Sequence, residues 1–432
     1  MNTYIKRLQA IITIIILIVL VYSIWIFAQA SNNLVTSSVF DHITLTWTGN
    51  PETTMTITWR ADSKTKNGFV QYQKGINFTN SAESVKATSA VFTTELGSSN
   101  LFTATLTNLS PNMKYIYRVG NGKSWSDTYT FSTSDMKVSK FKFLVFGDSQ
   151  SMATGKSPYG LWNKTIHNAY KANPDAKFAV NVGDLVDIGQ SGAHWNAWFS
   201  SAAGVIDSIP VMPVVGNHET MGIPYMRKPT FWNAQFHLPQ NGPPGLKNQV
   251  YSYNYGLAHF VVLDSQKNEE IKYGNIFTPQ KEWLDKDLKS TKAIWKIVFF
   301  HKAPYSLLVD RDNIEIKTAF CPIIEKYHTD IVFNGHDHGV ARTYPIKNDH
   351  LMAKPSEGTI YYVAGRSGSK TYDDIIKRTW NTFFYNPIDQ PNYLVVQVDD
   401  TQLTVKTVKQ DGTTVNTFFI DTNKDISSDS IK

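Results

Sequence analysis

From about Phe40 to Thr133, hydrophobic and polar residues alternate in short segments separated by turn signals. Alternation with a period of two turns one side of each segment toward a core and the other toward solvent, as in antiparallel strands. The pattern recurs in ITLTWTG, TMTITWRA, GFVQYQKG, FTATLTNLSP, KYIYRVGN and SDTYTFST. It predicts an all-β sandwich over residues 38–134, with no helix of any length.

After a polar linker, residues 134–140, the pattern changes to unbroken apolar runs separated by polar stretches of helical length. Continuous Val, Ile and Phe runs are typical of strands that are buried on both faces, in sheets flanked by helices. The runs are FKFLVFGD, AKFAVNVGD, IPVMPVVGNHE, HFVVLDS, WKIVFFH, DIVFNGHDH and TIYYVAGR. They predict an α/β domain over residues 140–422 of mostly buried β-sheets flanked by helices, followed by a polar tail at 423–432.

The N-terminus combines Lys6 and Arg7 with an uncharged apolar run from Ala10 to Ala30. A positive flank before an apolar run is typical of an export signal. The small residues of Ala28-Gln29-Ala30 favour a cleaved signal peptide over residues 1–30, whereas the length of the run favours a membrane anchor through residues 8–28. Both alternatives place the body of the chain outside the cytoplasm, secreted or attached to the cell surface.

The composition of the 432 residues is that of a folded protein, with 42% hydrophobic and 18% charged residues. A net charge of +6 mildly favours anionic partners, and no basic cluster interleaved with aromatic residues predicts a nucleic-acid-binding module. Cys321 is the only cysteine, which excludes a disulfide within the chain. The pattern leaves the oligomeric state open.

Five of the apolar runs end in a residue type that binds metals. In open α/β sheets, ligands bind at the carboxyl ends of the strands, so five strands would deliver their side chains to one edge. One such residue is commonly a turn or a cap, but five together predict a metal site. The residues are Asp148, Asp184, Asn217, His301 and the pair His336 and His338.

These motifs resemble the calcineurin-like metallophosphoesterases and, within them, the purple acid phosphatases. The matching blocks are GDSQ, GDLVD, GNHE, FFHKAPYS and GHDHGVART, in this order. YSYNYGLAHFVVLDS and YLVVQVDDTQLTVKTVKQDG carry the resemblance to about residue 420. An N-terminal β-sandwich is also the purple acid phosphatase arrangement, and NLSPNMKYIYRVG is similar to the late strands of fibronectin type III domains, in which a tyrosine packs at the corner between the sheets.

The resemblance implies two metal ions, for which the ligand types suit iron, manganese or zinc. It implies that Asp184 bridges both ions, that Asp148 and His338 bind the first ion, and that the second is bound by Asn217, His301 and His336. A metal-bound hydroxide would then attack the phosphorus of a phosphoester.

Two neighbours of Asn217 are implied catalytic residues. His218 would donate a proton to the leaving group or stabilise the transition state, with Glu219 holding its ring. Asp337 is expected to support the metal ligands from behind, and Arg342 matches a family position or is a structural ion-pair residue. His259 is expected to be packed and hydrogen-bonded, and His194 to lie on a core-facing helix, although it could approach the pocket.

Two positions depart from the family pattern at the first metal. Purple acid phosphatases place a tyrosine three residues after the bridging aspartate, where this chain has Asp187. The broader family places a histidine two residues after the first aspartate, where this chain has Gln150. Either side chain, through an amide or a carboxylate oxygen, is a candidate extra ligand of the first ion.

The sequence therefore predicts an exported dinuclear phosphatase that hydrolyses phosphomonoesters. A metal-dependent phosphodiesterase of the same fold remains an alternative, because substrate choice lies in loops such as residues 151–159, 222–247 and 310–318. A catalytically idle surface-binding protein is a second alternative, which the retained ligand types oppose.

The departure at Asp187 predicts the colour of the protein. Without a tyrosine at this position, iron-loaded protein is expected to lack the visible tyrosinate-to-iron absorption band. A visible spectrum of protein loaded with ferric iron checks this, and a strong purple band that survives removal of unbound iron would contradict it.

Overall fold

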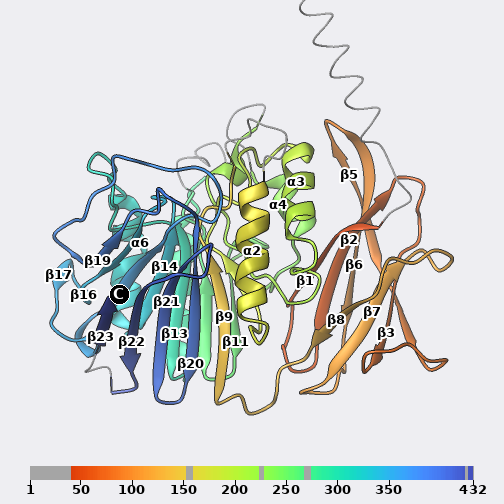
Figure 1. Cartoon of the computed structure of the whole chain (residues 1–432), viewed down its shortest axis with the longest axis horizontal. Helices are drawn as coiled ribbons and strands as arrows, with labels where there is room; N and C mark the ends of the chain where they lie inside the picture. The colour runs from red at the N-terminus through yellow and green to blue at the C-terminus, as the bar shows by residue number, and fades with distance from the viewer. Residues whose placement is uncertain (1–39, 152–158, 223–227, 267–273, 424–426, 432) are drawn as a thin grey trace, which may run out of the picture.

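The computed structural model of the chain describes residues 40–151, 159–222, 228–266, 274–423 and 427–431. The expected signal peptide or anchor, residues 1–30, lies outside the described residues. In the described part of the chain, no helix is long and apolar enough to cross a membrane. An all-β part and an α/β part lie side by side, the β strands of the first at the right of Figure 1.

The first part is a sandwich of two four-stranded antiparallel sheets, ordered β1-β2-β6-β5 and β4-β3-β7-β8. The backbone N–H of Ser110 donates to the Tyr115 hydroxyl at 2.8 Å, which is the tyrosine corner expected from the sequence. The strands are β1 (Asp41–Thr46), β2 (Met55–Asp62), β3 (Phe69–Lys74), β4 (Glu83–Lys86), β5 (Thr88–Thr94), β6 (Gly97–Leu106), β7 (Lys114–Gly120) and β8 (Tyr129–Ser132).

The α/β part contains a six-stranded sheet ordered β10-β9-β20-β21-β22-β23. Its strands are β9 (Lys140–Phe146), β10 (Ala179–Asn181), β20 (Asn392–Asp399), β21 (Gln402–Lys409), β22 (Thr414–Asp421) and β23 (Ser427–Ile431). The last strand lies inside the predicted polar tail and pairs antiparallel with β22. Backbone pairing therefore extends this sheet into a segment that has little hydrophobic sequence.

A seven-stranded sheet, ordered β11-β12-β13-β14-β18-β15-β19, lies against the six-stranded one. Its strands are β11 (Tyr251–Tyr255), β12 (Ala258–Val262), β13 (Trp295–Lys302), β14 (Ile331–Gly335), β15 (Val340–Thr343), β18 (Ile360–Ala364) and β19 (Asn381–Tyr385). A small hairpin of β16 (Ile346–Lys347) and β17 (His350–Leu351) projects from its edge.

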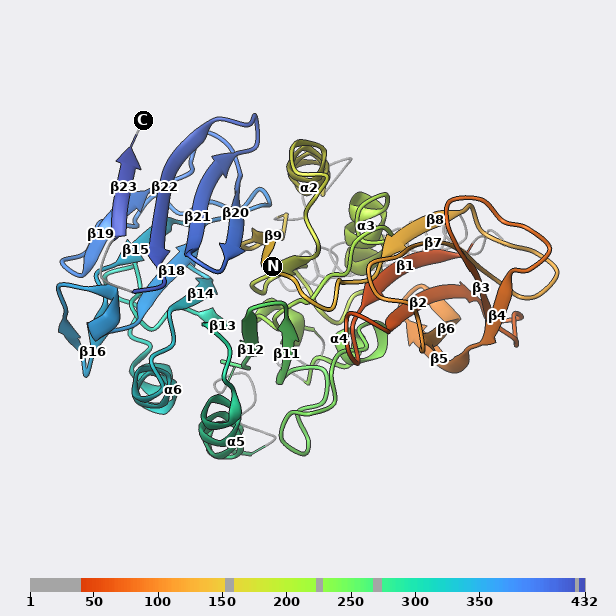
Figure 2. The same ribbon diagram turned by 90° about the horizontal axis from the view of Figure 1, so that it is seen from below.

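Helices lie beneath the seven-stranded sheet and beside the β9 and β20 side of the six-stranded sheet, as Figure 2 shows. Those beside the six-stranded sheet and the sandwich are α2 (Gly160–Ala172), α3 (Gly192–Ala202) and α4 (Thr230–Gln235), and those beneath the seven-stranded sheet are α5 (Phe277–Ser290) and α6 (Ile314–Lys326). Two 3-10 turns, η1 (His218–Thr220) and η3 (Pro355–Glu357), complete the described helical elements.

Alternate residues of the central strands pack on opposite sides. In β13, Ile297 and Phe299 join the core shared with the six-stranded sheet, whereas Val298 and Phe300 join the core beneath α5 and α6. Because both sides are buried, the strands are hydrophobic without interruption. The predicted fold, mostly buried sheets flanked by helices behind an all-β sandwich, is confirmed.

The sandwich is joined to the α/β part by backbone and side-chain bonds. Leu45 of β1 donates to the Ile206 carbonyl and accepts from the Val211 N–H, both at 2.9 Å. Glu95 accepts hydrogen bonds from the Gly192 and Ala193 backbone at the start of α3, where the helix dipole favours a carboxylate. One continuous core extends through both parts, so the sandwich is a fixed support of the α/β domain.

His42 is a titratable group buried at this junction, with 8% of its surface exposed. Its ring stacks on Phe199 with centroids 4.3 Å apart, and Nδ1 lies 3.0 Å from Gln235 Oε1. Burial lowers the pKa of His42 to about 4. The unfolded chain therefore binds a proton near pH 6.5 that the folded protein resists, so stability is lost as pH falls from about 6.5 to about 4.

We predict that His42→Asn removes this pH dependence. Asparagine tolerates the left-handed backbone at this residue, where φ is 52°. At about 1.4 kcal/mol per pKa unit, the wild type should lose up to about 3 kcal/mol more unfolding free energy than the variant between pH 7 and pH 4. Urea unfolding at both pH values measures this, and parallel losses in the two proteins would contradict it.

Candidate metal centre

The predicted ligands lie at one edge of the two sheets. Asp148 and Asp184 follow the parallel strands β9 and β10. His301 lies near the end of β13 and His336 follows β14, which are also parallel to each other. The hydrophobic run that ends at Asn217 forms no named strand, contrary to expectation. Val211 makes an isolated bridge to Ala179 in β10, and the chain continues from there to Asn217.

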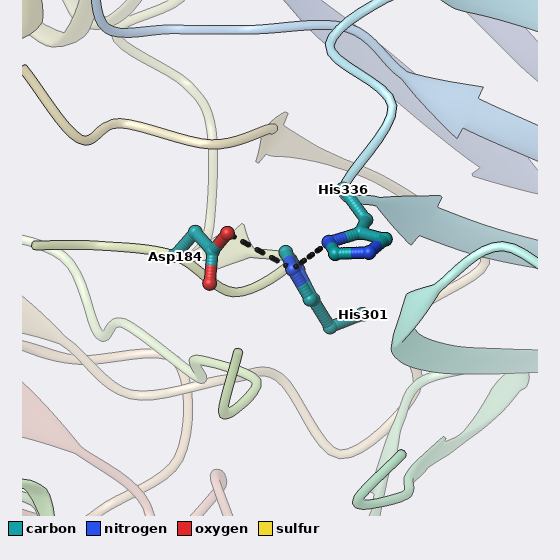
Figure 3. A group of neighbouring side chains, drawn as sticks. All are labelled: Asp184, His301 and His336. Atoms are coloured by element: carbon teal, nitrogen blue, oxygen red, sulfur yellow. Dashed lines mark hydrogen bonds and ion pairs between the residues drawn. The ribbon is translucent and has the colours of Figure 1, made fainter. Parts of the chain in front are cut away.

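Three of the predicted ligands converge on the Nε2 atom of a fourth, His301. Asp184 Oδ2 and His336 Nδ1 each lie 3.1 Å from this atom, and Asn217 Oδ1 lies 3.2 Å from it. Figure 3 shows Asp184, His301 and His336 pointing toward one another. These three could hold one ion among them, with the amide oxygen of Asn217 as a further donor.

Asp148 and His338 form a second group. Asp148 Oδ1 lies 3.4 Å from His338 Nε2, and both side chains are almost fully buried. The backbone N–H of His336 donates to both Asp148 carboxylate oxygens at 3.0 Å, which ties this group to the first. The fold thus brings all six predicted ligands together, with Asp148 and His338 in one group and the other four around His301.

The backbone is left-handed at four of the six ligands. The φ angles are 22° at Asp148, 53° at Asp184, 73° at His336 and 55° at His338. Such angles are uncommon for residues other than glycine, and they persist where surrounding structure enforces them, often at functional sites. At this sheet edge, each turn directs a side chain inward immediately after its strand.

Glycine is required beside two of these turns. A Cβ atom on Gly216 would collide with the backbone nitrogen and the carboxylate of Asp184, and one on Gly183 would collide with the ring of His301. The Gly-Asp and Gly-Asn pairs of the sequence motifs therefore permit close approach of neighbouring ligand segments.

The charges of the buried ligands are coupled. Burial alone would lower the pKa of His301, but the Asp184 carboxylate outweighs it and raises the pKa to about 9. Burial likewise opposes ionisation of Asp184, yet the His301 charge holds its pKa well below the usual range. Burial also raises the pKa of Asp148 and lowers that of His338 to about 3.

These residues fit metal ions. His338 Nδ1 lies 2.7 Å from the Lys370 carbonyl and donates to it, which leaves the lone pair of Nε2 directed at Asp148. Nε2 is buried and has no hydrogen-bond partner among the described residues. Similarly, His301 Nδ1 donates to the Val182 carbonyl at 2.8 Å, which turns its Nε2 toward the other ligands. Second bonds of this kind orient metal-binding imidazoles.

His218 lies at the site, but Glu219 does not hold its ring as expected. His218 Nδ1 donates to the Asp187 carbonyl at 2.7 Å, and Nε2 lies 3.9 Å from Asp184 Oδ2. The Glu219 carboxylate instead accepts from the backbone amides of Gly216 and Asp184, at 2.7 and 2.9 Å, and from the two residues that follow Asp184. Burial and the nearby Asp184 charge raise the pKa of Glu219, whereas the backbone N–H groups that donate to both of its oxygens favour the ionised form. Glu219 is therefore a positioning residue for the backbone around Asp184.

The two candidate replacement ligands differ in position. In the amide orientation that pairs donors with acceptors, the Gln150 nitrogen lies 3.3 Å from Asp184 Oδ2 and the Gln150 oxygen lies 3.1 Å from His218 Nε2. The Asp187 carboxylate accepts instead from the Ser151 amide at 2.9 Å and the Tyr159 hydroxyl at 3.1 Å. Gln150 thus lies beside the predicted bridging carboxylate of Asp184, although in this orientation its nitrogen, and not its oxygen, faces that carboxylate.

The other polar residues singled out in the sequence have supporting places. Asp337 accepts from the Leu307 amide and from Arg311, at 2.7 and 2.5 Å. Arg342 packs over the Phe418 ring at 4.0 Å and donates to Thr382.

Two further histidines singled out in the sequence, His259 and His194, are both hydrogen-bonded. As expected, His259 lies between Asn254 and Asp287, at 2.8 and 2.7 Å. His194 Nδ1 lies 3.1 Å from the Tyr159 hydroxyl, so it reaches the edge of the site through Tyr159 and Asp187.

Sequence reasoning missed Lys370 and Tyr372. The Lys370 ammonium lies 3.3 Å from His218 Nε2, and the Tyr372 ring packs on His338 with centroids 4.7 Å apart. Both belong to the loop after β18, whose hydrophobic run, TIYYVAGR, ends without a metal-binding residue type. A loop after a buried strand at the same sheet edge was the signal that could have identified them.

Two family models match this chain: Purple acid Phosphatase, N-terminal domain, over residues 40–133, and Calcineurin-like phosphoesterase, over residues 141–340. The second match contains all six predicted ligands. Residues 141–340 are therefore a calcineurin-like metallophosphoesterase domain, which follows a purple acid phosphatase-type N-terminal domain at residues 40–133.

Relatives of this metallophosphoesterase are distant. The Fe(3+)-Zn(2+) purple acid phosphatase 12 of Arabidopsis thaliana is 28% identical over 261 residues, which are 56% of this chain and 52% of that one. Probable inactive purple acid phosphatase 27 of the same plant is 24% identical, over 66% of this chain and 52% of its own length. This chain spans about half the length of these curated relatives.

A solved structure of a purple acid phosphatase from yellow lupin seeds has the same fold. It matches with a TM-score of 0.74 at 20% identity and covers 89% of this metallophosphoesterase and 74% of the lupin chain. The structure of PhoD matches with a TM-score of 0.62 at 14% identity, over 92% of this chain and 94% of that one. Relatives carry both active and inactive names, so activity has to be argued from the residues of the site.

We predict that Glu219→Gln weakens metal binding. An amide nitrogen would face backbone N–H groups that now donate to a carboxylate oxygen, and the segment carrying Asp184 would loosen. Removing such a supporting group typically lowers metal affinity by about 10- to 100-fold. Competition with a coloured chelator measures the affinity for zinc or manganese, and circular dichroism checks folding.

The matched control is Glu282→Gln on the exposed surface of α5, which should bind metal as the wild type does. Wild-type affinity in the Glu219 variant would show that these backbone bonds do not support the metal centre.

Proposed function

We propose that this metallophosphoesterase is an exported, dinuclear metal-dependent phosphatase that hydrolyses phosphomonoesters. The observation that carries the proposal is the convergence of the six predicted ligand side chains in two groups, which the bond from the His336 backbone N–H to Asp148 joins. The apolar N-terminal run supports export. The retained ligand types, four of them with left-handed backbone, oppose the idle, surface-binding alternative, because strained backbone clusters at functional sites.

The donor set assigns roles to this chain's own residues. Asp148, His338 and Gln150 would hold one ion, Asn217, His301 and His336 the other, and Asp184 would bridge them. When bound, such ions lower the pKa of a water molecule and neutralise charge on phosphoryl oxygens. Iron, manganese and zinc all suit imidazole with carboxylate and amide oxygens.

His218 is the residue placed to serve the leaving group. Its Nδ1–H is fixed by the Asp187 carbonyl, so Nε2 faces the site at a constant orientation. A positioned imidazole of this kind contributes about 10²- to 10⁴-fold when it transfers a proton in the transition state. The protein supplies orientation, and the reaction otherwise depends on positioning and electrostatics.

The test combines metal analysis with hydrolysis of two model esters. We expect the purified full-length chain to bind about two metal ions and to hydrolyse 4-nitrophenyl phosphate faster than bis(4-nitrophenyl) phosphate. His336→Ala removes a predicted ligand and should lower kcat/KM by at least about 100-fold, because mutating even a residue that only supports a ligand typically lowers metal affinity or activity by about 10- to 100-fold. His350→Ala, at an exposed histidine outside the site, is the control.

Three results would contradict parts of this proposal. Faster diester hydrolysis would favour the phosphodiesterase alternative. One metal ion per chain would contradict the dinuclear site. No turnover of either ester with added manganese, iron or zinc would leave a surface-binding protein on a metallophosphoesterase fold.

A further inference from the structure

Lys370 places a positive charge at the candidate centre. Its Nζ lies 3.3 Å from His218 Nε2 and 3.2 Å from the Gln150 amide oxygen, in the amide orientation that pairs donors with acceptors. The ammonium also lies 5.4 Å from the centroid of the Tyr372 ring. Among the described residues, no salt bridge joins Lys370 to a carboxylate.

The main chain around Lys370 is fixed to the metal-binding motifs. Its carbonyl accepts from His338 Nδ1 at 2.7 Å, and the preceding Ser369 donates to the Gln150 carbonyl at 3.1 Å. Gly368 donates to the Asp148 carbonyl at 3.0 Å, and a Cβ atom at Gly368 would collide with the Gln150 carbonyl. The loop before Lys370 is therefore bonded to the first motif at successive residues, which fixes the backbone from which the Lys370 side chain extends.

The Lys370 side chain is therefore positioned both at its backbone and at its ammonium group. The ammonium can only donate, so its partner in this amide orientation is the Gln150 oxygen, and its 3.3 Å approach to His218 Nε2 is a hydrogen bond only while that nitrogen carries no proton. A half-buried ammonium that is hydrogen-bonded to an amide oxygen, and joined by no salt bridge among the described residues, offers its positive charge to an anionic ligand. Because few waters reach such a position, that charge acts more strongly than on the open surface.

We propose that Lys370 binds the phosphoryl group of the substrate and selects phosphomonoester dianions over phosphodiesters. This inference rests on the proposed function. A monoester presents three terminal oxygens and close to two negative charges at neutral pH, whereas a diester presents two oxygens and one charge. With two metal ions at the site, a third positive group finds an additional oxygen only on the monoester.

The test measures binding and catalysis separately. Lys370→Met keeps the length of the stem and removes the charge, and Lys370→Arg keeps the charge. Lys377→Met, at an exposed lysine of the same loop, is the matched control. Each full-length protein is loaded with manganese, its metal content is measured, and inorganic phosphate is titrated into it by calorimetry.

We expect Lys370→Met to keep its metal content and to raise the Kd for phosphate by about 10- to 100-fold, the value of one charged hydrogen bond. kcat/KM should fall by a similar factor for 4-nitrophenyl phosphate and by less than about threefold for bis(4-nitrophenyl) phosphate. Lys370→Arg should recover part of both losses, and Lys377→Met should match the wild type.

Other results would overturn the proposal. An unchanged Kd for phosphate would show that Lys370 does not bind the phosphoryl group, whether or not the wild type turns over. Equal losses for both esters would remove the selectivity. Loss of metal from Lys370→Met would assign the lysine to support of the metal site. An inactive wild type with lysine-dependent phosphate binding would refute the proposed function while keeping Lys370 as an anion-binding residue.

Discussion

The Asp184 carboxylate is the group on which the rest of the site depends. With 2% of its side chain exposed, it would be costly as an isolated charge. The His301 ring and the His218 backbone N–H, at 3.1 and 2.9 Å, compensate that charge from two sides. Glu219 in turn fixes the backbone of Asp184 itself. Folding and metal binding are consequently linked, since a metal ion replaces the proton that now neutralises this cluster.

The two sheets of the α/β part divide the work of placing the ligands. The six-stranded sheet delivers Asp148 and Asp184, and the seven-stranded sheet delivers His301, His336 and His338. The hydrophobic core between the sheets therefore sets the spacing between acidic and imidazole ligands. The sandwich contributes indirectly. Its strand β1 bonds to the segment at 206–211, which continues to Asn217. A domain that touches no predicted ligand thus fixes the route to one of them.

The sequence predicted the buried parts of this protein best. Continuous hydrophobic runs identified the central strands β9, β10, β12, β13, β14 and β18, because a strand buried on both faces is hydrophobic without interruption, but they did not identify β11, β15 to β17 or β19 to β22. It missed β4 and β5, whose residues are mostly exposed and polar, and β23, which exists by backbone pairing. Alternation cannot reveal a strand that buries no side of itself.

At the site, too, the sequence revealed local patterns and did not reveal contacts that form only in the folded protein. Residue types that bind metals, placed directly after hydrophobic runs, were visible one motif at a time. The role of Glu219 was not, because four backbone donors from two segments are a property of the folded loop. Lys370 was missed because its residue type does not distinguish it from a solvated lysine, and only its position in the loop after the buried strand β18 points to the site.

Both departures from the family pattern at the first metal, Gln150 and Asp187, leave fewer anionic donors at that site. A tyrosinate ligand carries a negative charge, whereas Gln150 offers a neutral oxygen and the Asp187 carboxylate is engaged by Tyr159 and Ser151. Lys370 adds a positive charge nearby. A first site with fewer anionic donors stabilises a trivalent ion less than a divalent one, so we expect divalent ions at both positions. The same excess of positive charge favours the most negative form of a phosphoester, so substrate preference and metal preference have a common electrostatic origin in this chain.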